Sequence, residues 1–446
     1  MKPVLTIIAF ALVAAVAYSD DNDDLFGEGL VSEPQEPASG LEETLLVSES
    51  VEIGGQYRFD LEAAGVWDDA FEGGLRYREA DELSLSTRLS SRLYFDARPH
   101  RDFRVYGRVT VSYPFETNSP DGDDPATRER TLQDVFRVEE LFSDFTWRDA
   151  VYFRGGLQTL GWGVGTFFAP ADLLNPRMTM RVDPDLPRRG RVGVRASIPA
   201  GINNADVYLL LPERAEPQPL DAGIAARGDL VAGRGEVSLG AFYQHDAAPA
   251  AMVAATRSLG DFDLFTEAVL RYGSERIFVE ESAGFPGLSV RETDDEMFVS
   301  AMAGLRYTYD PAESTWGFRA IGEYFRNGEG YRDPSVITDN RDAIGVLLGE
   351  GLISADDLAT TGRHYTALSG AFTDLLGTDL SVGLLWVRNY TDRSSLLVPS
   401  VSGTVFNRIT LTLSSSVSLG DKGDELAPQG NRLAVSVGAS IGGGSF

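Results

Sequence analysis

From residue 51 onward, the chain is dominated by segments in which apolar and polar residues alternate one by one. In the segment 51–63 the odd positions include Ile53 and Leu61, whereas the even positions include Arg58 and Asp60. Because successive side chains of a strand point to opposite faces, such a segment has one apolar and one charged face. A soluble β-sandwich shows the same pattern, so one strand alone does not separate it from a membrane barrel.

Eighteen segments match this two-residue period, and most are 10 to 15 residues long. They are 51–63, 83–98, 103–115, 136–148, 150–159, 190–199, 204–212, 221–231, 235–245, 249–258, 261–273, 296–309, 315–327, 363–374, 378–389, 394–405, 408–420 and 430–441. A tilted strand crosses a bilayer in about 9–11 residues. The segments 204–212, 221–231 and 249–258 are rich in Ala and Gly. If two of them are not strands, the count is 16, and 16 or 14 strands are the alternatives to 18.

The connections between these segments alternate between short and long. Short turns such as 99–101 and 310–314 separate longer stretches that include 160–189, 274–295 and 328–362. One rim of short turns and one of long loops is typical of outer-membrane barrels. We therefore predict an all-β fold, a transmembrane antiparallel β-barrel over 51–446, with 18 strands and both termini on the short-turn rim.

The N-terminal residues predict export. Met1-Lys2 is followed by an apolar run at 4–17 and by Ala17-Tyr18-Ser19, which has the small-x-small form of a cleavage site. The run is short for a helix that needs about 20 residues to span a bilayer. We predict a cleaved signal peptide at 1–19 and a flexible acidic periplasmic leader at 20–50.

Charge and residue usage exclude several classes of function. The formal net charge of -28 argues against a nucleic-acid partner. The absence of Cys excludes disulfides and thiolate metal sites. The three histidines, His100, His245 and His364, fall on different predicted elements without a well-placed Ser or carboxylate. We expect no enzymatic activity, no cofactor and no metal.

One stretch has the character of a family motif. The segment 156–176 reads GLQTLGWGVGTFFAPADLLNP. It resembles a strand-and-loop motif of porin-like outer-membrane β-barrels and, more distantly, of alginate-export-type channels. The resemblance covers about 40 residues of the chain and implies a channel, but it does not imply a particular substrate.

This motif opens the third long loop, 160–189. In many porins that loop folds into the lumen and narrows it. Charges of both signs follow the motif and are candidates for a constriction: Asp172, Arg177, Arg181, Asp183, Asp185, Arg188 and Arg189. Opposed charges in a narrow pore set ion preference. The alternative is a structural loop that caps the rim.

The polar faces of the first strands carry many arginines. The predicted lumen-lining set is Arg58, Arg88, Arg92, Arg104, Arg108, Arg154, Arg191 and Arg195. Such a wall could favour anions, as rings of Arg do in anion pores. The other interpretation, which we prefer, is a lumen of paired charges with weak selectivity.

The chain ends in Phe446, after an alternating segment that includes Leu433 and Ile441. An amphipathic last strand closing on Phe resembles the signal read by the outer-membrane assembly machinery. Phe446 is out of phase with the preceding apolar positions. We therefore predict a kink in Gly442–Gly444, where glycine permits a bulge.

These observations predict an integral outer-membrane channel for passive diffusion of small hydrophilic solutes. Its expected partners are outer-membrane lipid, the assembly machinery and the solutes, and the oligomeric state stays open. The first alternative is a plugged barrel whose loops 274–295 and 328–362 bind surface ligands, as an adhesin does. The second is a selective channel for a hydrophobic or polymeric substrate.

Overall fold

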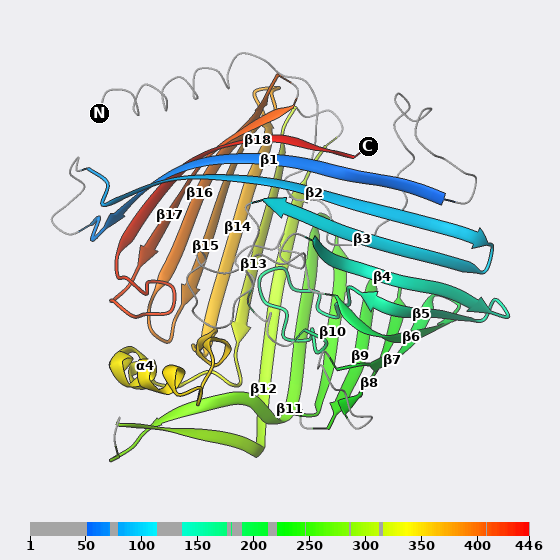
Figure 1. Cartoon of the computed structure of the whole chain (residues 1–446), viewed down its shortest axis with the longest axis horizontal. Helices are drawn as coiled ribbons and strands as arrows, with labels where there is room; N and C mark the ends of the chain where they lie inside the picture. Colours follow the sequence, from blue (N-terminus) through cyan, green and yellow to red (C-terminus); the bar gives the residue numbers. More distant parts are fainter. Residues whose placement is uncertain are drawn as a thin grey trace.

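The computed structural model describes residues 51–71, 79–113, 136–175, 180, 190–212, 221–245, 247–284, 287–311, 315–406 and 408–445. These residues form one sheet of 18 antiparallel strands, and each strand pairs with its neighbours in the sequence. β18 pairs with β1 as well as with β17, so the sheet closes into a barrel (Figure 1). The predicted fold class and the count of 18 strands are confirmed.

The strands are β1 (Val51–Asp68), β2 (Glu82–His100), β3 (Phe103–Tyr113), β4 (Phe136–Trp147), β5 (Val151–Gln158), β6 (Arg191–Ala200), β7 (Asn203–Leu210), β8 (Gly223–Ala232), β9 (Gly235–Gln244), β10 (Ala250–Leu259), β11 (Phe262–Glu281), β12 (Leu288–Tyr309), β13 (Gly317–Arg326), β14 (His364–Leu375), β15 (Leu380–Asn389), β16 (Ser395–Val405), β17 (Ile409–Leu419) and β18 (Arg432–Ser445). Three short helices lie between β13 and β14: α3 (Ser335–Thr338), α4 (Arg341–Gly349) and η3 (Ala355–Leu358). Among the described helices, none is long and apolar enough to cross a membrane.

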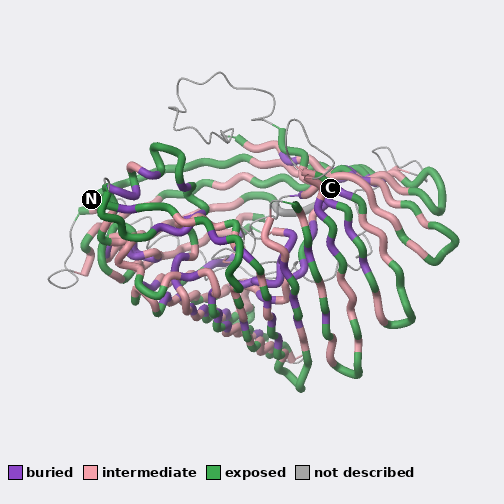
Figure 2. The backbone as a smooth tube through the Cα atoms, turned by 90° about the horizontal axis from the view of Figure 1, so that it is seen from below, coloured by how far each residue is buried: buried purple, intermediate pink, exposed green. Residues whose placement is uncertain are grey.

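The two faces of the barrel wall differ in the way that the alternation requires. On β2, Leu83 and Leu85 point outward and are 76% and 73% exposed. On β10, outward Val253 is exposed, whereas its inward neighbours Met252 and Ala254 are buried. In Figure 2 the turns at the strand ends are exposed, and buried residues lie along the strands. The apolar face is thus outside and the charged face inside, the reverse of a soluble protein.

The prediction of a loop at 274–295 was wrong. β11 continues to Glu281 and β12 begins at Leu288, so most of this stretch is a hairpin that projects beyond the rim (Figure 1). Its apolar residues have a partner far along the chain. Val279 and Leu288 pack against Ile344 and Leu347 of α4 in a small separate core. This packing extends the strands past the length that a bilayer requires.

The glycine run near the C-terminus contains the predicted kink. The register between β1 and β18 shifts between Gln56 and Arg58, which pair with Ser445 and Gly442. Gly442 has a φ of 106°, and a Cβ there would lie 2.1 Å from the carbonyl oxygen of Tyr57. Only glycine fits this bulge. Phe446 and the segments 1–19 and 20–50 lie outside the described residues, so their predicted roles stay predictions.

Candidate functional site

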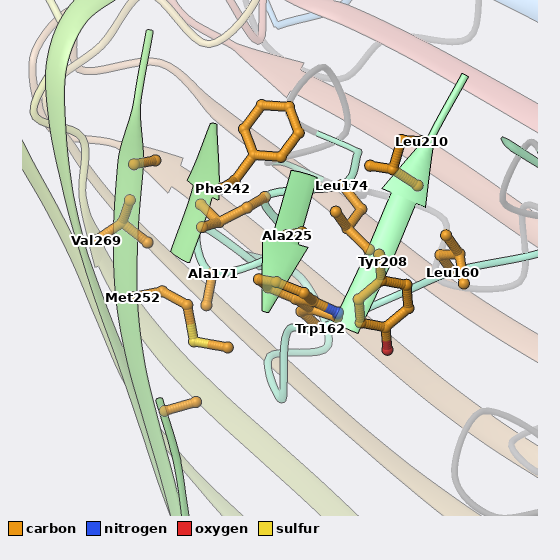
Figure 3. Packing of buried hydrophobic residues seen from close by; sticks show 13 residues of the cluster. Leu160, Trp162, Ala171, Leu174, Tyr208, Leu210, Ala225, Phe242, Met252 and Val269 are labelled. Carbon is orange, nitrogen blue, oxygen red and sulfur yellow. The ribbon is translucent and has the colours of Figure 1, made fainter. Parts of the chain in front are cut away.

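The segment 160–175, which follows β5, runs along the inner wall of the barrel. Trp162 and Leu174 lie over the strands that carry Tyr208 and Ala225 (Figure 3). The buried cluster they form spans inward positions of five strands, β7 to β11: Tyr208, Leu210, Ala225, Phe242, Ala250, Met252, Ala254 and Val269. Burial of these apolar side chains fixes the segment inside the barrel.

The next part of the segment crosses to further strands. Phe168 is fully buried and stacks on Phe325 of β13, with ring centroids 5.2 Å apart. Tyr365 of β14 lies beside both rings. The same cluster includes Phe265 of β11 and Met302 of β12. Residues 160–175 therefore cover the inner wall from β7 to β14.

Two buried carboxylates hold the backbone of this segment. Glu267 of β11 accepts hydrogen bonds from the N–H groups of Val164, Gly165 (2.8 Å) and Ala171 (2.8 Å). Glu323 of β13 accepts hydrogen bonds from three more, those of Thr166 (2.6 Å), Phe167 (2.9 Å) and Phe168 (2.9 Å). Charge-assisted hydrogen bonds of this kind are about twice as strong as neutral ones. Sequence analysis missed both glutamates, because no local pattern links them to a segment about 100 or more residues away.

The glycines of the motif permit close packing. A Cβ at Gly165 would lie 1.9 Å from the carbonyl oxygen of Phe168 and 2.5 Å from Met302. A Cβ at Gly163 would lie 2.8 Å from that of Ala169. Glycine is needed here because the chain folds tightly against itself and the wall.

Asp172 is the one predicted constriction residue within the described part of the chain. It is 3% exposed, and its Oδ1 accepts hydrogen bonds from the Trp162 N–H (3.2 Å) and the Asn175 side chain (3.0 Å). Its carboxylate thus holds the segment's own fold. The others, Arg177, Arg181, Asp183, Asp185, Arg188 and Arg189, lie outside the described residues.

All eight predicted lumen arginines occupy inward-facing positions, and most are paired. Arg104 reaches Asp96 with two bonds of 2.9 Å, and Arg154 reaches Asp144 with bonds of 2.7 and 3.0 Å. The ion pairs of the other predicted arginines are Arg58–Asp60, Arg92–Glu139, Arg108–Glu139, Arg108–Glu140 and Arg195–Asp206. Two-pronged contacts of this kind are geometrically specific.

The remaining two arginines of the set, Arg191 and Arg88, differ from these six in their surroundings. Arg191 donates a 2.8 Å hydrogen bond to the carbonyl of Leu174, so it helps to hold the inner segment. Arg227, which the sequence analysis did not select, donates a 3.4 Å bond to the carbonyl of Trp162 and pairs with Asp229. Arg88 is exposed, and no carboxylate within the described ranges lies within 4.0 Å of its guanidinium.

A bulge in β4 turns a second acid toward the inner wall. The register between β3 and β4 shifts between Arg108 and Val109, and Glu139 is the extra residue. Both Glu139 and Glu140 therefore point inward, and each pairs with Arg108. Strict alternation would have placed one of them outside. The two successive glutamates inside the predicted strand were the sequence signal that could have predicted this bulge.

The part of the wall that adjoins β1 carries fewer charges. Apart from Arg432, which pairs with Asp68 and Glu82, the inward positions of β17 and β18 carry hydroxyl and small side chains: Thr410, Thr412, Ser414, Ser416, Ser418, Ala434, Ser436, Gly438 and Ser440. The hydroxyls of Ser414 and Ser436 lie 2.8 Å apart. The inner surface therefore differs around the barrel: ion pairs dominate on β1 to β6, apolar side chains lie beneath residues 160–175, and hydroxyls line β17 and β18.

The histidines lie apart from one another. Nδ1 of His100 is 3.8 Å from a carboxylate oxygen of Asp102 in an exposed turn, and Nδ1 of His364 is 2.7 Å from the Tyr324 hydroxyl. Within the described ranges, no group of three or more His, Asp or Glu could hold a metal ion.

No protein-family model and no curated protein matches the chain. Solved structures with a similar chain path include a BenF-like porin from Pseudomonas fluorescens, with 8% identity and a TM-score of 0.49. The structure of Pseudomonas aeruginosa OpdK with vanillate has 10% identity and a TM-score of 0.48, and that of Acinetobacter baumannii OccAB1 has 11% identity and a TM-score of 0.47. They cover 88%, 89% and 87% of this chain and 98%, 99% and 96% of their own. At such scores and identities, we infer neither substrate nor mechanism from them.

Proposed function

We propose that the protein is an outer-membrane channel through which small hydrophilic solutes diffuse passively. The inverted barrel wall carries this proposal: the exposed apolar side chains point outward, and the inner face carries arginines, carboxylates and hydroxyls. An apolar outer band suits lipid, and a polar interior suits water. A soluble barrel would gain nothing from the exposure of residues such as Leu83 and Leu85.

We further propose that the third long loop, 160–189, narrows the lumen. The wall contacts of residues 160–175 support this, because the segment occupies space inside the barrel and is held by Glu267 and Glu323. The charges at Arg177, Arg181, Asp183, Asp185, Arg188 and Arg189 would then act on a passing solute. Asp172 would act indirectly, through the shape of the segment.

The paired arginines favour weak charge selectivity. A guanidinium that shares its charge with a carboxylate at about 3 Å presents little net field to a passing ion. The ion pairs of Arg104, Arg154 and Arg195 support this interpretation over a purely anion-selective wall. Arg88 is the exception and would act as a local anion contact.

The proposed route to the membrane uses both ends of the chain. We propose that 1–19 is removed on export, that 20–50 remains in the periplasm, and that Phe446 takes part in recognition by the assembly machinery. The bulge at Gly442 supports the last point, since it changes the phase of the residues that follow. The motif at 156–176 fits a porin-like family.

A surface ligand-binding role is the second candidate, and one observation favours it. The projecting β11–β12 hairpin and the segment 328–362 enclose a groove of about 310 Å³, lined in part by Phe278, Arg291, Tyr331 and Arg363. A charged and aromatic groove at a rim is suited to ligand capture.

Liposome swelling tests the channel. We expect proteoliposomes with the refolded full chain to swell in small neutral sugars, at a rate that falls with sugar size. A heat-modifiable, correctly folded barrel that gives no swelling with any sugar would favour the plugged, ligand-binding barrel instead.

A further inference from the structure

The outward face of β13 to β16 has an apolar groove of about 660 Å³. Its outward-facing lining residues are Phe318, Leu368, Gly370, Phe372, Val382, Leu384, Trp386 and Leu397. Gly370 pairs in register with Ala320 on one side and Leu384 on the other, so small residues lie between bulky ones. The groove therefore lies over β14 and β15, with Phe318 of β13 and Leu397 of β16 at its sides.

Two arginines lie on the same face beyond the groove: Arg388 is one row and Arg326 two rows past the pairing of Leu368 with Trp386. Arg388 is two residues beyond Trp386, and Arg326 pairs in register with His364. A step of two residues along a strand is about 6.6 Å. These positions lie at the ends of β13, β14 and β15 on the long-loop rim. The apolar groove thus lies close to two arginines at the edge of the barrel.

The described residues give these arginines no acidic partner. Arg388 donates a 2.8 Å hydrogen bond to the Ser395 hydroxyl, and Arg326 donates a 3.1 Å bond to the carbonyl of Val299. Within the described ranges, no carboxylate lies within 4.0 Å of either guanidinium. On the inner wall, in contrast, arginines such as Arg104, Arg154 and Arg195 pair with carboxylates, in a chain with a net charge of -28.

We propose that this surface binds one phosphate-bearing lipid, with an acyl chain in the groove and the phosphate on Arg326 and Arg388. Guanidinium groups bind phosphate oxygens in a two-pronged manner. Cations at the membrane edge contact anionic lipid headgroups. Between the two arginines, on β14, lie His364, which pairs in register with Arg326, and Thr366, which pairs with Arg388, and they complete the polar edge. The inference depends on the proposed function only in that the barrel is embedded in a membrane.

Native mass spectrometry of the refolded full chain, released from detergent micelles, tests the site. The probes are dimyristoyl phosphatidic acid, dimyristoylglycerol with the same chains but no phosphate, and inorganic phosphate without chains. We expect one phosphatidic acid to be retained per chain and the other two probes to be lost. Equal retention of dimyristoylglycerol would overturn the proposal.

Two variants separate the charge from the groove. Arg326→Gln with Arg388→Gln should reduce retention about tenfold or more, a change of about 1.4 kcal/mol or more. Gly370→Leu should abolish retention by filling the groove, since the nearest atoms to a Cβ there are 3.8 Å away and the fold can accept a side chain. Retention as strong as in the wild type in either variant would contradict the proposal.

Each variant has a matched control. Arg257→Gln removes an exposed outward arginine at the opposite rim, and Gly228→Leu adds a side chain at an outward glycine with nothing within 4 Å. Both should retain the lipid as the wild type does. Loss of retention in a control would show nonspecific binding and overturn the site. Conductance of the same preparations reports the channel separately, so a silent barrel that retains the lipid would contradict the channel alone.

Discussion

Glu267 of β11 and Glu323 of β13 together accept six backbone hydrogen bonds from one inner segment of the chain. The two side chains are 1% and 2% exposed. Burial of a charge is costly unless hydrogen bonds compensate for it. The segment 160–175 supplies these bonds, so its position on the inner wall and the two carboxylates depend on each other.

Glu267→Gln should loosen the inner segment without opening the barrel. The amide retains one acceptor oxygen but turns an NH2 group toward N–H donors, at a cost of about 1–3 kcal/mol for each unsatisfied group. Hydrogen exchange at Val164, Gly165 and Ala171 should speed up, and single-channel currents should become noisier. Glu52→Gln, at an exposed inward position of β1 away from the segment, is the control. Unchanged exchange in Glu267→Gln would exclude the proposed support.

Gly165→Ala should displace the same segment by a steric route. The added carbon would lie 1.9 Å from the carbonyl oxygen of Phe168, so the backbone must shift, and overpacking typically costs about 1–3 kcal/mol. We expect greater protease accessibility of the segment and a lower unfolding temperature in detergent. Gly228→Ala, in open space, should show neither change.

Asp144→Asn should make the lumen more anion-selective. Asp144 contacts both Arg154 (2.7 Å) and Arg104 (3.5 Å), and its neutralisation leaves Arg154 without that charge partner. The reversal potential in a salt gradient should move toward the value expected for a pore that passes only anions. Asp102→Asn, in an exposed short turn, should leave it nearly unchanged. A shift toward cations in Asp144→Asn would contradict the assignment of these arginines to the lumen.

The contact between Asp357 and the projecting hairpin should be lost in acid. Burial acts to raise the pKa of Asp357, but hydrogen bonds from the Ile277 N–H (2.9 Å) and from Ser354 lower it below its usual 3.8. A lowered folded pKa gives stabilisation that is present above 3.8 and lost as the pH falls through the folded value.

Protection of the Ile277 amide from exchange measures this contact. We expect the protection factor to be constant from pH 7 to 5 and to fall in acid below 3.8, whereas Asp357→Asn should lower it already at pH 7. Asp342→Asn, on α4, serves as the control. A protection factor that rises in acid would reverse the sign of the effect and refute the assignment.

The strands could be predicted because each one shows the alternation of apolar and polar residues within its own sequence. Even Ala- and Gly-rich β7, β8 and β10 kept enough alternation to be placed. The mispredicted and the missed features lie where distant residues or a bulge determine local structure. The hairpin beyond Tyr272 is extended by α4, which lies more than 60 positions later, and Glu139 points inward because a bulge breaks the alternation.

The inner site was harder to predict than the wall. The motif at 156–176 indicated where a loop would enter, and the arginine positions followed from strand parity. The partners that hold the segment, Glu267 and Glu323, come from strands about 100 to 160 residues away. Their role depends on barrel closure, so it cannot be predicted from a local pattern in the sequence.

Single-channel recording in a planar bilayer tests the central claim most directly. With the refolded full chain, we predict stable open steps of uniform conductance and a small reversal potential in a salt gradient. A folded, heat-modifiable barrel that inserts but stays silent at all voltages would contradict the claim that this protein is a diffusion channel.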